Sequence, residues 1–552
     1  MPHALTKAWL EPLVEIICPL QTERVTGSVA LILHAHLPFV RHPEHEAFLE
    51  EEWLFEAITE SYVPLLRMLL RLGEEAVPVR LGFSVTPTLC AMLQDPLLLR
   101  RYLKHLDELI GLADRECCRN RSNAALSRLA RFYRHFFSET RRTFCDEWNC
   151  DLLGVLRQLR ASGLIEIIAS AATHGLLPLL DQTPGAARAQ VALGCDRYRD
   201  VFGGELRGFW LPECAYAPGI DQLLAEEDIR WFIVDGHALT HARPPARRGT
   251  FAPCYTPAGP AAFARDARAS RQVWSAQSGY PGHPIYREFY RDIGFDLPAA
   301  ELPGSRKFTG LKYYRITGND EAKDFYDPAR AEEVARQHAL DFVAQRIADL
   351  DSVSADNFVP IVTVPFDAEL FGHWWFEGPV FLEHVLRNIA ARTHEIALTT
   401  PGEFLANNPA QQVVTPSASS WGDKGFLDVW LDPKSSWVYP HLLAAARQMA
   451  KLAQKHEANV NAQTERALRQ LGRELLLAQS SDWPFLIRNE TARHYATQRM
   501  NDHLQRFARL AASLENGRVD PAFLAECEER DNLFPNLNWR HFAHFIIPSA
   551  AK

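Results

Sequence analysis

The sequence predicts an α/β protein built around an incomplete (β/α)7 barrel, and three observations support this fold class. Short apolar runs alternate with helical stretches, several of these runs end on polar residues, and the pattern becomes helical after about residue 406. Strands that alternate with helices are typical of a parallel sheet or barrel. With 552 residues, 47% of them hydrophobic, the chain is long enough for two or three structural units.

Seven runs have the length and composition of buried strands. They cover residues 29–36, 79–86, 165–170, 206–211, 231–235, 359–366 and 396–399. Polar side chains of catalytic type stand at or just after the ends of several runs: His34, His36, His174, Glu213, Asp235 and Asp367. Because the C-terminal ends of barrel strands carry the active site, we expect these side chains to lie close together.

The pattern divides the chain into four parts. Residues 1–27 form an N-terminal extension, 28–405 the barrel, 91–150 a helical insertion within it, and 406–552 a C-terminal all-helical domain. Helical periodicity supports the insertion and four later helices, over residues 438–456, 460–479, 491–514 and 521–530. Residues 242–270 are rich in Pro, Gly, Ala and Arg, which predicts an extended loop overhanging the active face.

Composition excludes several classes of partner. The chain has 59 Lys and Arg against 68 Asp and Glu, a formal charge of −9, and no basic stripe, so we expect no nucleic acid partner. No segment approaches the roughly 20 apolar residues of a membrane span, so we expect no membrane partner. The 10 cysteines have no CxxC pair or regular spacing, which favours reduced thiols in a cytoplasmic protein.

The run LILHAHLPF contains His34 and His36, which lie two residues apart on a predicted strand and therefore project to the same side. Such a pair can bind zinc, donate hydrogen bonds to sugar hydroxyls, or be satisfied within the core. No third metal ligand is evident nearby. A metal-dependent deacetylase is therefore one alternative for this segment, beside a sugar site and a purely structural pair.

Two further segments carry carboxylates among aromatic residues. In RGFWLPECAYAPG, Glu213 lies between Trp210 and Tyr216, a setting that suits a glycosidase, although a glutamate after a strand often simply begins a helix. In IVTVPFDAELFGHWWFEGP, Asp367 and Glu369 directly follow a strand. This density of carboxylates and aromatic rings indicates a site rather than packing. Spacing alone does not choose between Asp367 and Glu369.

Four motifs in this order, HAHLPF, GFWLPECAY, WFIVDGH and PFDAELFGHWWFEGP, resemble the signature regions of glycoside hydrolase family 57, especially its α-1,4-glucan branching enzymes. The similarity continues through QVWSAQSGYPGHPIYREFYRDIGFD, TPSASSWGDKGFLDVWL and AQSSDWPFL. It implies that Glu213 is the nucleophile and Asp367 the general acid/base of a retaining reaction without metal or cofactor. It further implies a sugar-binding cleft, to which we add the neighbouring Trp210 and Trp375: His34, His36, His174, Trp210, Asp235, Trp274, Trp375, Trp421, Trp430 and Asp482.

The resemblance implies branching: cleavage of an α-1,4 bond of an α-glucan and transfer of the chain to a 6-hydroxyl of an acceptor glucan, by a monomer or small homo-oligomer. A 4-α-glucanotransferase or an amylase-type hydrolase is the alternative. Branching enzymes of the family typically carry a long loop with a tyrosine near its tip after the region matching WFIVDGH, whereas residues 241–253 contain no tyrosine. A non-catalytic glycan-binding protein is disfavoured because both carboxylates are present.

Overall fold

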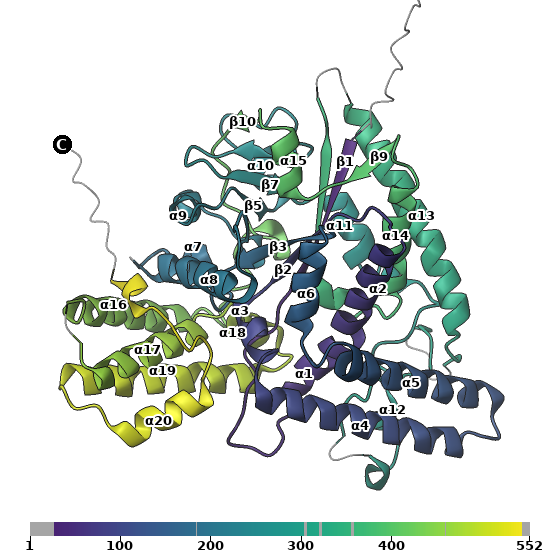
Figure 1. Cartoon of the computed structure of the whole chain (residues 1–552), viewed down its shortest axis with the longest axis horizontal. Helices are drawn as coiled ribbons and strands as arrows, with labels where there is room; N and C mark the ends of the chain where they lie inside the picture. Colours follow the sequence, from purple (N-terminus) through teal and green to yellow (C-terminus); the bar gives the residue numbers. More distant parts are fainter. Residues whose placement is uncertain are drawn as a thin grey trace, which may run out of the picture.

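The computed structural model describes residues 27–543, except 184, 303–305, 319–322, 355–357 and 459. The predicted N-terminal extension lies outside the described residues, apart from Gly27, which begins the first strand. Figure 1 shows a curled sheet at the centre, the C-terminal helices on one side of it, and a long pair of helices below it on the other side.

Seven strands of a ten-stranded sheet run parallel to one another and form the barrel. They are β1 (Gly27–Ala35), β2 (Leu81–Val85), β3 (Ile165–Ser170), β4 (Gly208–Trp210), β5 (Trp231–Val234), β7 (Ala261–Ala264) and β8 (Ile361–Asp367). They pair in the order β7-β5-β4-β3-β2-β1-β8. The outer strands β7 and β8 meet through one parallel bridge, between Arg265 and Thr363. The predicted α/β fold with an incomplete barrel is confirmed.

The strands form because their sequences are apolar on both faces, as expected for a parallel sheet covered by helices. All nine residues of β1, GSVALILHA, are buried. The register places His34 of β1 opposite Ser84 of β2 and Asp367 of β8. Three polar side chains are thereby brought side by side at the C-terminal ends of adjacent strands.

The prediction of an extended loop over residues 242–270 is wrong. This region contains β6 (Cys254–Tyr255), the barrel strand β7, and the start of α11 (Ala267–Trp274). The strand sequence AAFA is rich in alanine, a weak strand former, so its local signal is poor. The predicted run at 396–399 forms β9 (Ile396–Leu398), which pairs only with the start of β1 and lies off the barrel path.

Helices α4 (Pro96–Arg119) and α5 (Ala124–Arg142) lie between β2 and β3 and pack against each other, where the sequence predicts a helical insertion. Each begins at a side chain that accepts backbone N–H groups of the first turn: Asp95 from Leu97 and Leu98, and Asn123 from Ala125 and Leu126. The domain boundaries themselves remain a prediction.

The N-terminal part contains further helices. They are α1 (Glu51–Glu56), α2 (Val63–Glu74), α3 (Pro87–Met92), α6 (Leu152–Ala161), α7 (Leu177–Leu180), α8 (Ala186–Phe202), α9 (Ile220–Glu226), α10 (Gly236–Thr240), α12 (Ile293–Asp296), α13 (Pro328–Val353), α14 (Gly378–Ala390) and α15 (Pro401–Asn407). The strand β10 (Gln412–Val413) pairs with β6 at the edge of the sheet. Among the residues described, no helix combines the length and the apolar character needed to cross a membrane.

The C-terminal part is helical, as predicted. It consists of α16 (Val438–Lys455), α17 (Ala462–Ala478), α18 (Asp482–Asn489), α19 (Arg493–Glu515) and α20 (Pro521–Arg530). Helix α17 is central, because α16, α19 and α20 all pack against it and residues 471–478 are all buried. The short α18 has no counterpart among the predicted helices, and its first residue, Asp482, faces the barrel mouth.

Candidate active site

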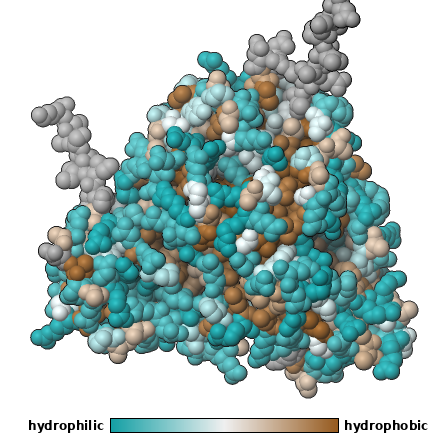
Figure 2. All heavy atoms as spheres, in the orientation of Figure 1, coloured by the Kyte–Doolittle hydropathy of each residue, from teal (hydrophilic) through white to brown (hydrophobic). Residues whose placement is uncertain are grey.

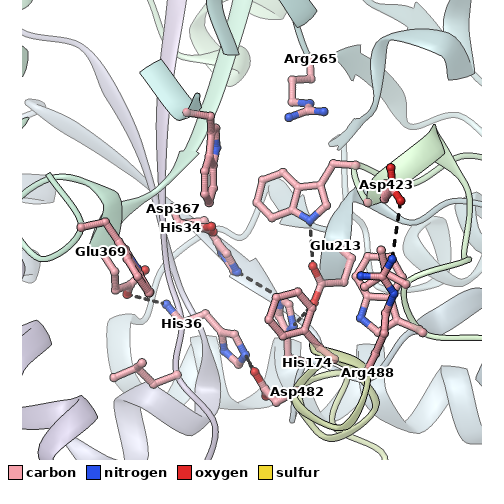
Figure 3. A pocket seen from close by; sticks show the side chains of 18 residues that line it. His34, His36, His174, Glu213, Arg265, Asp367, Glu369, Asp423, Asp482 and Arg488 are labelled. Atoms are coloured by element: carbon pink, nitrogen blue, oxygen red, sulfur yellow. Dashed lines mark hydrogen bonds and ion pairs between the residues drawn. The ribbon is translucent and has the colours of Figure 1, made fainter. Parts of the chain in front are cut away.

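A cavity of about 650 Å³ lies at the C-terminal ends of the barrel strands (Figure 3). Its walls come from both parts of the chain, since the barrel supplies the base and the segment from residue 421 onward supplies one side. The lining residues are His34, His36, Leu37, His174, Glu213, Arg265, Trp274, Asp367, Glu369, Trp374, Trp421, Gly422, Asp423, Val429, Trp430, Asp482, Phe485 and Arg488.

Glu213 follows β4 in a single helical turn whose backbone is unusual. Its φ is 61° and ψ is 22°, and Cys214 follows with a φ of 49°. Left-handed backbone at residues other than glycine costs of order 1 kcal/mol and concentrates at functional sites. The surrounding contacts hold the turn, since Trp421 donates its backbone N–H to the Glu213 carbonyl at 3.0 Å. The geometry directs the carboxylate into the cavity.

Both carboxylate oxygens of Glu213 accept hydrogen bonds from residues beyond the barrel strands. Trp421 Nε1 donates to Oε2 at 2.8 Å, and Ser481 Oγ donates to Oε1 at 2.9 Å. Burial raises the pKa of Glu213, with the charge of Asp482 acting in the same direction, while these two donors oppose the shift. The two donors therefore orient the carboxylate at both oxygens and partly offset the effect of burial on its pKa.

Asp367 has a different environment at the end of β8. Burial, and then the charges of Glu369 and Glu213, raise its pKa well above the ordinary value of an aspartate, against the opposing charge of Arg265. No hydrogen bond from the described residues reaches its carboxyl group. Asp367 is therefore set to remain protonated and free to meet a ligand in the cavity.

Glu369 lies two residues further on and is engaged with the protein. Its Oε1 accepts hydrogen bonds from the hydroxyl of Tyr62 and from the backbone N–H of His36, the latter at 3.1 Å. Burial raises its pKa to about 7, although these donors act in the opposite direction. Glu369 has less freedom than Asp367 to approach a ligand, a distinction that sequence spacing does not provide.

Three histidines form the base of the cavity. His34 Nε2 lies 3.1 Å from His174 Nε2, and the His36 and His174 rings stack with centroids 3.8 Å apart. His34 also contacts Ser84 Oγ at 3.0 Å, and His174 contacts Ser481 Oγ at 2.9 Å. Hydrogen bonds therefore connect β1, β3 and the α17–α18 junction in one continuous chain that ends at Glu213.

The pKa values of the three histidines shift in different directions because the side chains have different partners. Burial, and then the charge of His36, lowers the pKa of His34 well below normal, and the same causes, joined by the charge of His34, lower that of His174. For His36 burial acts in the same direction, but the neighbouring Asp482 carboxylate at 3.1 Å outweighs it and raises the pKa. Within the described residues, these histidines belong to no cluster of three metal-ligating side chains.

The remaining predicted residues fall into two groups. Trp274, Trp421, Trp430 and Asp482 line the cavity. Trp210, Asp235 and Trp375 do not line it. Trp210 is fully buried and stacks on His34 with centroids 4.1 Å apart, so it supports a lining residue.

Asp235 acts through a neighbour as well, because its Oδ2 lies 2.7 Å from Arg265 Nη2 and Arg265 lines the cavity. Trp375 is 2% exposed and packs against Tyr286 and Phe381. The structure therefore places Trp375 in the core rather than in the cleft.

Sequence reasoning missed eight lining residues, of which five are charged or aromatic: Arg265, Trp374, Asp423, Phe485 and Arg488. Arg265 directly follows β7, the strand that was read as loop. Phe485 and Arg488 lie on α18, which was also not recognised. Trp374 stands beside Trp375 in the motif GHWWFEGP, and only the fold shows which of the two faces the cavity.

Removal of the Ser481 hydroxyl should disturb the ionisation of Glu213. A hydrogen bond to a charged group is worth about 1.5–3 kcal/mol, so in Ser481→Ala the pKa of Glu213 should rise by about one to two units. Because a nucleophile must be ionised, the acidic limb of the plot of log(kcat/KM) against pH should shift to higher pH by about the same number of units. An unmoved acidic limb in a variant with parental thermal stability would contradict this role.

The fold and the site define an enzyme of the glycoside hydrolase type, with two carboxyl groups of unlike environment facing one cavity with aromatic walls. The chain belongs to glycosyl hydrolase family 57, whose family model matches residues 30–416. A second model, for the C-terminal region of 1,4-alpha-glucan branching enzymes, matches residues 441–542. The resemblance seen in the sequence motifs is confirmed.

Three relatives are informative. The 1,4-alpha-glucan branching enzyme of Thermococcus kodakarensis is 33% identical over 551 residues, 92% of this chain and 77% of its own. The branching enzyme structure from Pyrococcus horikoshii is 34% identical, with a TM-score of 0.86 over 94% of this chain and 97% of its own. The alpha-amylase AmyC of Thermotoga maritima is 38% identical, with a TM-score of 0.88 over 94% of this chain and 100% of its own.

Proposed function

We propose that this protein is a 1,4-α-glucan branching enzyme that cleaves an α-1,4 bond with retention and transfers the released chain to a 6-hydroxyl of an acceptor glucan. One observation carries the proposal. Ser481, within the segment matched by the branching-enzyme C-terminal model, donates a hydrogen bond to Glu213 at 2.9 Å. The C-terminal helical part thus contributes directly to the reacting group.

The environments of the two carboxyl groups support distinct roles. Burial raises the pKa of both carboxyl groups. Two hydrogen-bond donors lower the pKa of Glu213 again, whereas no described residue donates to Asp367, whose pKa is raised further by the charges of Glu369 and Glu213. Glu213 therefore ionises first and attacks the anomeric carbon. Asp367 retains its proton, donates it to the leaving glycosidic oxygen, and then takes a proton from the incoming hydroxyl.

The other lining residues would bind the sugar. Trp274 is 40% exposed, and with Trp421 and Trp430 it offers aromatic faces on which a pyranose ring can stack. Both ring nitrogens of His36 are engaged, Nδ1 by Thr86 and Nε2 by the Asp482 carboxylate, so His36 holds Asp482 at the cavity wall, where this carboxylate can accept a hydrogen bond from a sugar hydroxyl. Arg265, which directly follows β7 and donates a hydrogen bond to Asp235, adds a further donor whose position is fixed.

An amylase-type hydrolase is the second candidate, and two observations favour it. AmyC, an alpha-amylase, is 38% identical to this chain. In addition, residues 241–253 contain no tyrosine, and within the described residues none from this stretch lines the cavity. The Arg243 backbone instead pairs with that of Thr415. A site less covered by this loop would admit water as the acceptor more readily.

The product of amylose decides between the two candidates. Purified protein should generate new α-1,6 linkages, measured by proton NMR, with few new reducing ends. An increase in reducing ends without new branches would show hydrolysis and overturn the branching assignment. A change in chain lengths with neither new branches nor new reducing ends would indicate disproportionation. Boiled enzyme and Glu213→Gln protein are the controls.

We further propose that the natural donor and acceptor are glycogen-like α-glucans in the cytoplasm. All nine described cysteines are free, which supports a reducing compartment. A monomer or small homo-oligomer remains our prediction for the assembly, and light scattering coupled to size-exclusion chromatography measures it directly.

A further inference from the structure

A set of aromatic side chains extends outward from the catalytic cavity. It begins at Trp374, which lines the cavity and is 54% exposed. The Trp374 ring stacks on Phe289, with centroids 4.6 Å apart and planes 23° from parallel. Because Phe289 covers one face of the indole, the remaining exposed face is available to a ligand.

The ring contacts continue beyond Trp374. Phe289 lies 5.0 Å from Tyr290 and 5.9 Å from Phe308, and Phe308 lies 5.1 Å from Phe295, all between ring centroids. Tyr290 is 76% exposed and Phe295 46% exposed. We name these five residues, Phe289, Tyr290, Phe295, Phe308 and Trp374, the aromatic strip.

Buried charges hold the strip in place. Lys312 is 2% exposed, and its ammonium group lies 4.1 Å from the Phe289 centroid and 5.0 Å from that of Phe308. The Asp292 carboxylate accepts the backbone N–H groups of Gly294, Thr309 and Gly310 at 2.8–3.0 Å. These contacts join the two ends of the segment that carries the rings, so the strip is preorganised.

An exposed aromatic ring by itself needs no explanation. Here, however, three exposed rings are linked through two partly buried rings and start at the wall of a catalytic cavity. Figure 2 shows a face that is mostly hydrophilic, with hydrophobic residues gathered toward its middle. Exposed Arg291 and its partner Asp296 also lie in this segment, 2.9 Å apart, and supply planar polar groups beside the rings. Rings flanked by such groups are suited to a pyranose, which presents C–H faces and hydroxyl edges.

We propose that the aromatic strip is an outer binding site for the α-1,4-glucan chain whose reacting end occupies the cavity. The identity of the ligand rests on the proposed function, whereas the location of the site rests on continuity with the cavity. Tyr290 and Phe295 lie one and two ring contacts beyond Phe289, so a chain of several glucose units reaches them from the cavity and a di- or trisaccharide does not. The strip therefore selects long donors.

The test compares a Tyr290→Ala/Phe295→Ala protein with the parent on amylose and on maltotriose. We expect KM for amylose to rise about tenfold from the loss of two stacking contacts, with a much smaller change for maltotriose. Phe325→Ala is the matched control, because Phe325 is also an exposed phenylalanine, at 40%, but its ring partner Tyr314 lies outside the strip. Its KM values should equal those of the parent.

Native gels containing amylose or a β-1,4-glucan provide a readout without turnover. Amylose should retard the parent and the Phe325→Ala protein more than the double variant, and the β-glucan should retard none of them. Equal retardation and equal KM values in parent and double variant would overturn the outer site while leaving the branching proposal standing. If the double variant loses the retardation that the parent shows, but the parent forms no branches, the outer site stands and branching is overturned instead.

Discussion

Glu213→Gln should reduce turnover of amylose by at least about 10³-fold, because the amide cannot attack the anomeric carbon. The substitution preserves shape and hydrogen bonding. The amide oxygen can still accept from Trp421 Nε1, and the amide nitrogen can donate to Ser481 Oγ, whose hydroxyl can reverse its role. The folded site should therefore survive with its nucleophile removed. Steady-state rates on amylose and a thermal melt measure both effects.

A smaller variant separates nucleophilic attack from simple charge stabilisation. Glu213→Ala leaves room for a small anion, so added azide should restore bond cleavage and yield a glycosyl azide of inverted configuration. Parental turnover in Glu213→Gln, or absence of any glycosyl azide from an otherwise folded Glu213→Ala protein, would remove Glu213 from the role of nucleophile.

Asp367→Asn should lower kcat on amylose by about 10²–10⁴-fold, the usual contribution of a general acid. A substrate whose leaving group needs no proton, such as an α-maltosyl fluoride, should recover much of the rate of the first step in this variant but not in Glu213→Gln. The same rate deficit on both substrates would show that Asp367 does not donate the proton.

The dependence of rate on pH gives an independent check. The raised pKa of Asp367 keeps its proton in place to higher pH, so activity should fall as pH rises through that pKa, which forms the basic limb. The acidic limb should follow Glu213, which must lose its proton. The pKa values that the two limbs report belong to a coupled group of carboxyls. Even so, Asp367→Asn should flatten the basic limb and leave the acidic limb in place.

Glu369→Gln is the matched control for Asp367→Asn. Glu369 lies in the same cavity but accepts hydrogen bonds from Tyr62 and His36, so we expect a loss of no more than about tenfold. If Glu369→Gln is the more damaging change and Asp367→Asn is tolerated, the roles assigned to the two carboxyls are exchanged.

Most of the barrel was predictable because its signals are local. The apolar run at 29–36 corresponds to β1 (Gly27–Ala35), and the run at 165–170 corresponds to β3. Buried parallel strands are apolar on both faces, so such runs stand out without knowledge of their partners. The strand β7 was missed because AAFA carries little strand propensity and forms through pairing with β5 on one side and β6 on the other.

The sequence by itself determined the class of fold, the helical C-terminal part and, through its motifs, the family and the two candidate carboxyls. Only the tertiary structure decided how those carboxyls differ. The donors that hold Glu213 lie 208 and 268 residues away along the chain, and no periodicity or spacing reports a contact over such a distance. Asp367 and Glu369 are two residues apart, yet burial and partners distinguish them, because ionisation depends on the surroundings in space rather than on neighbours in sequence.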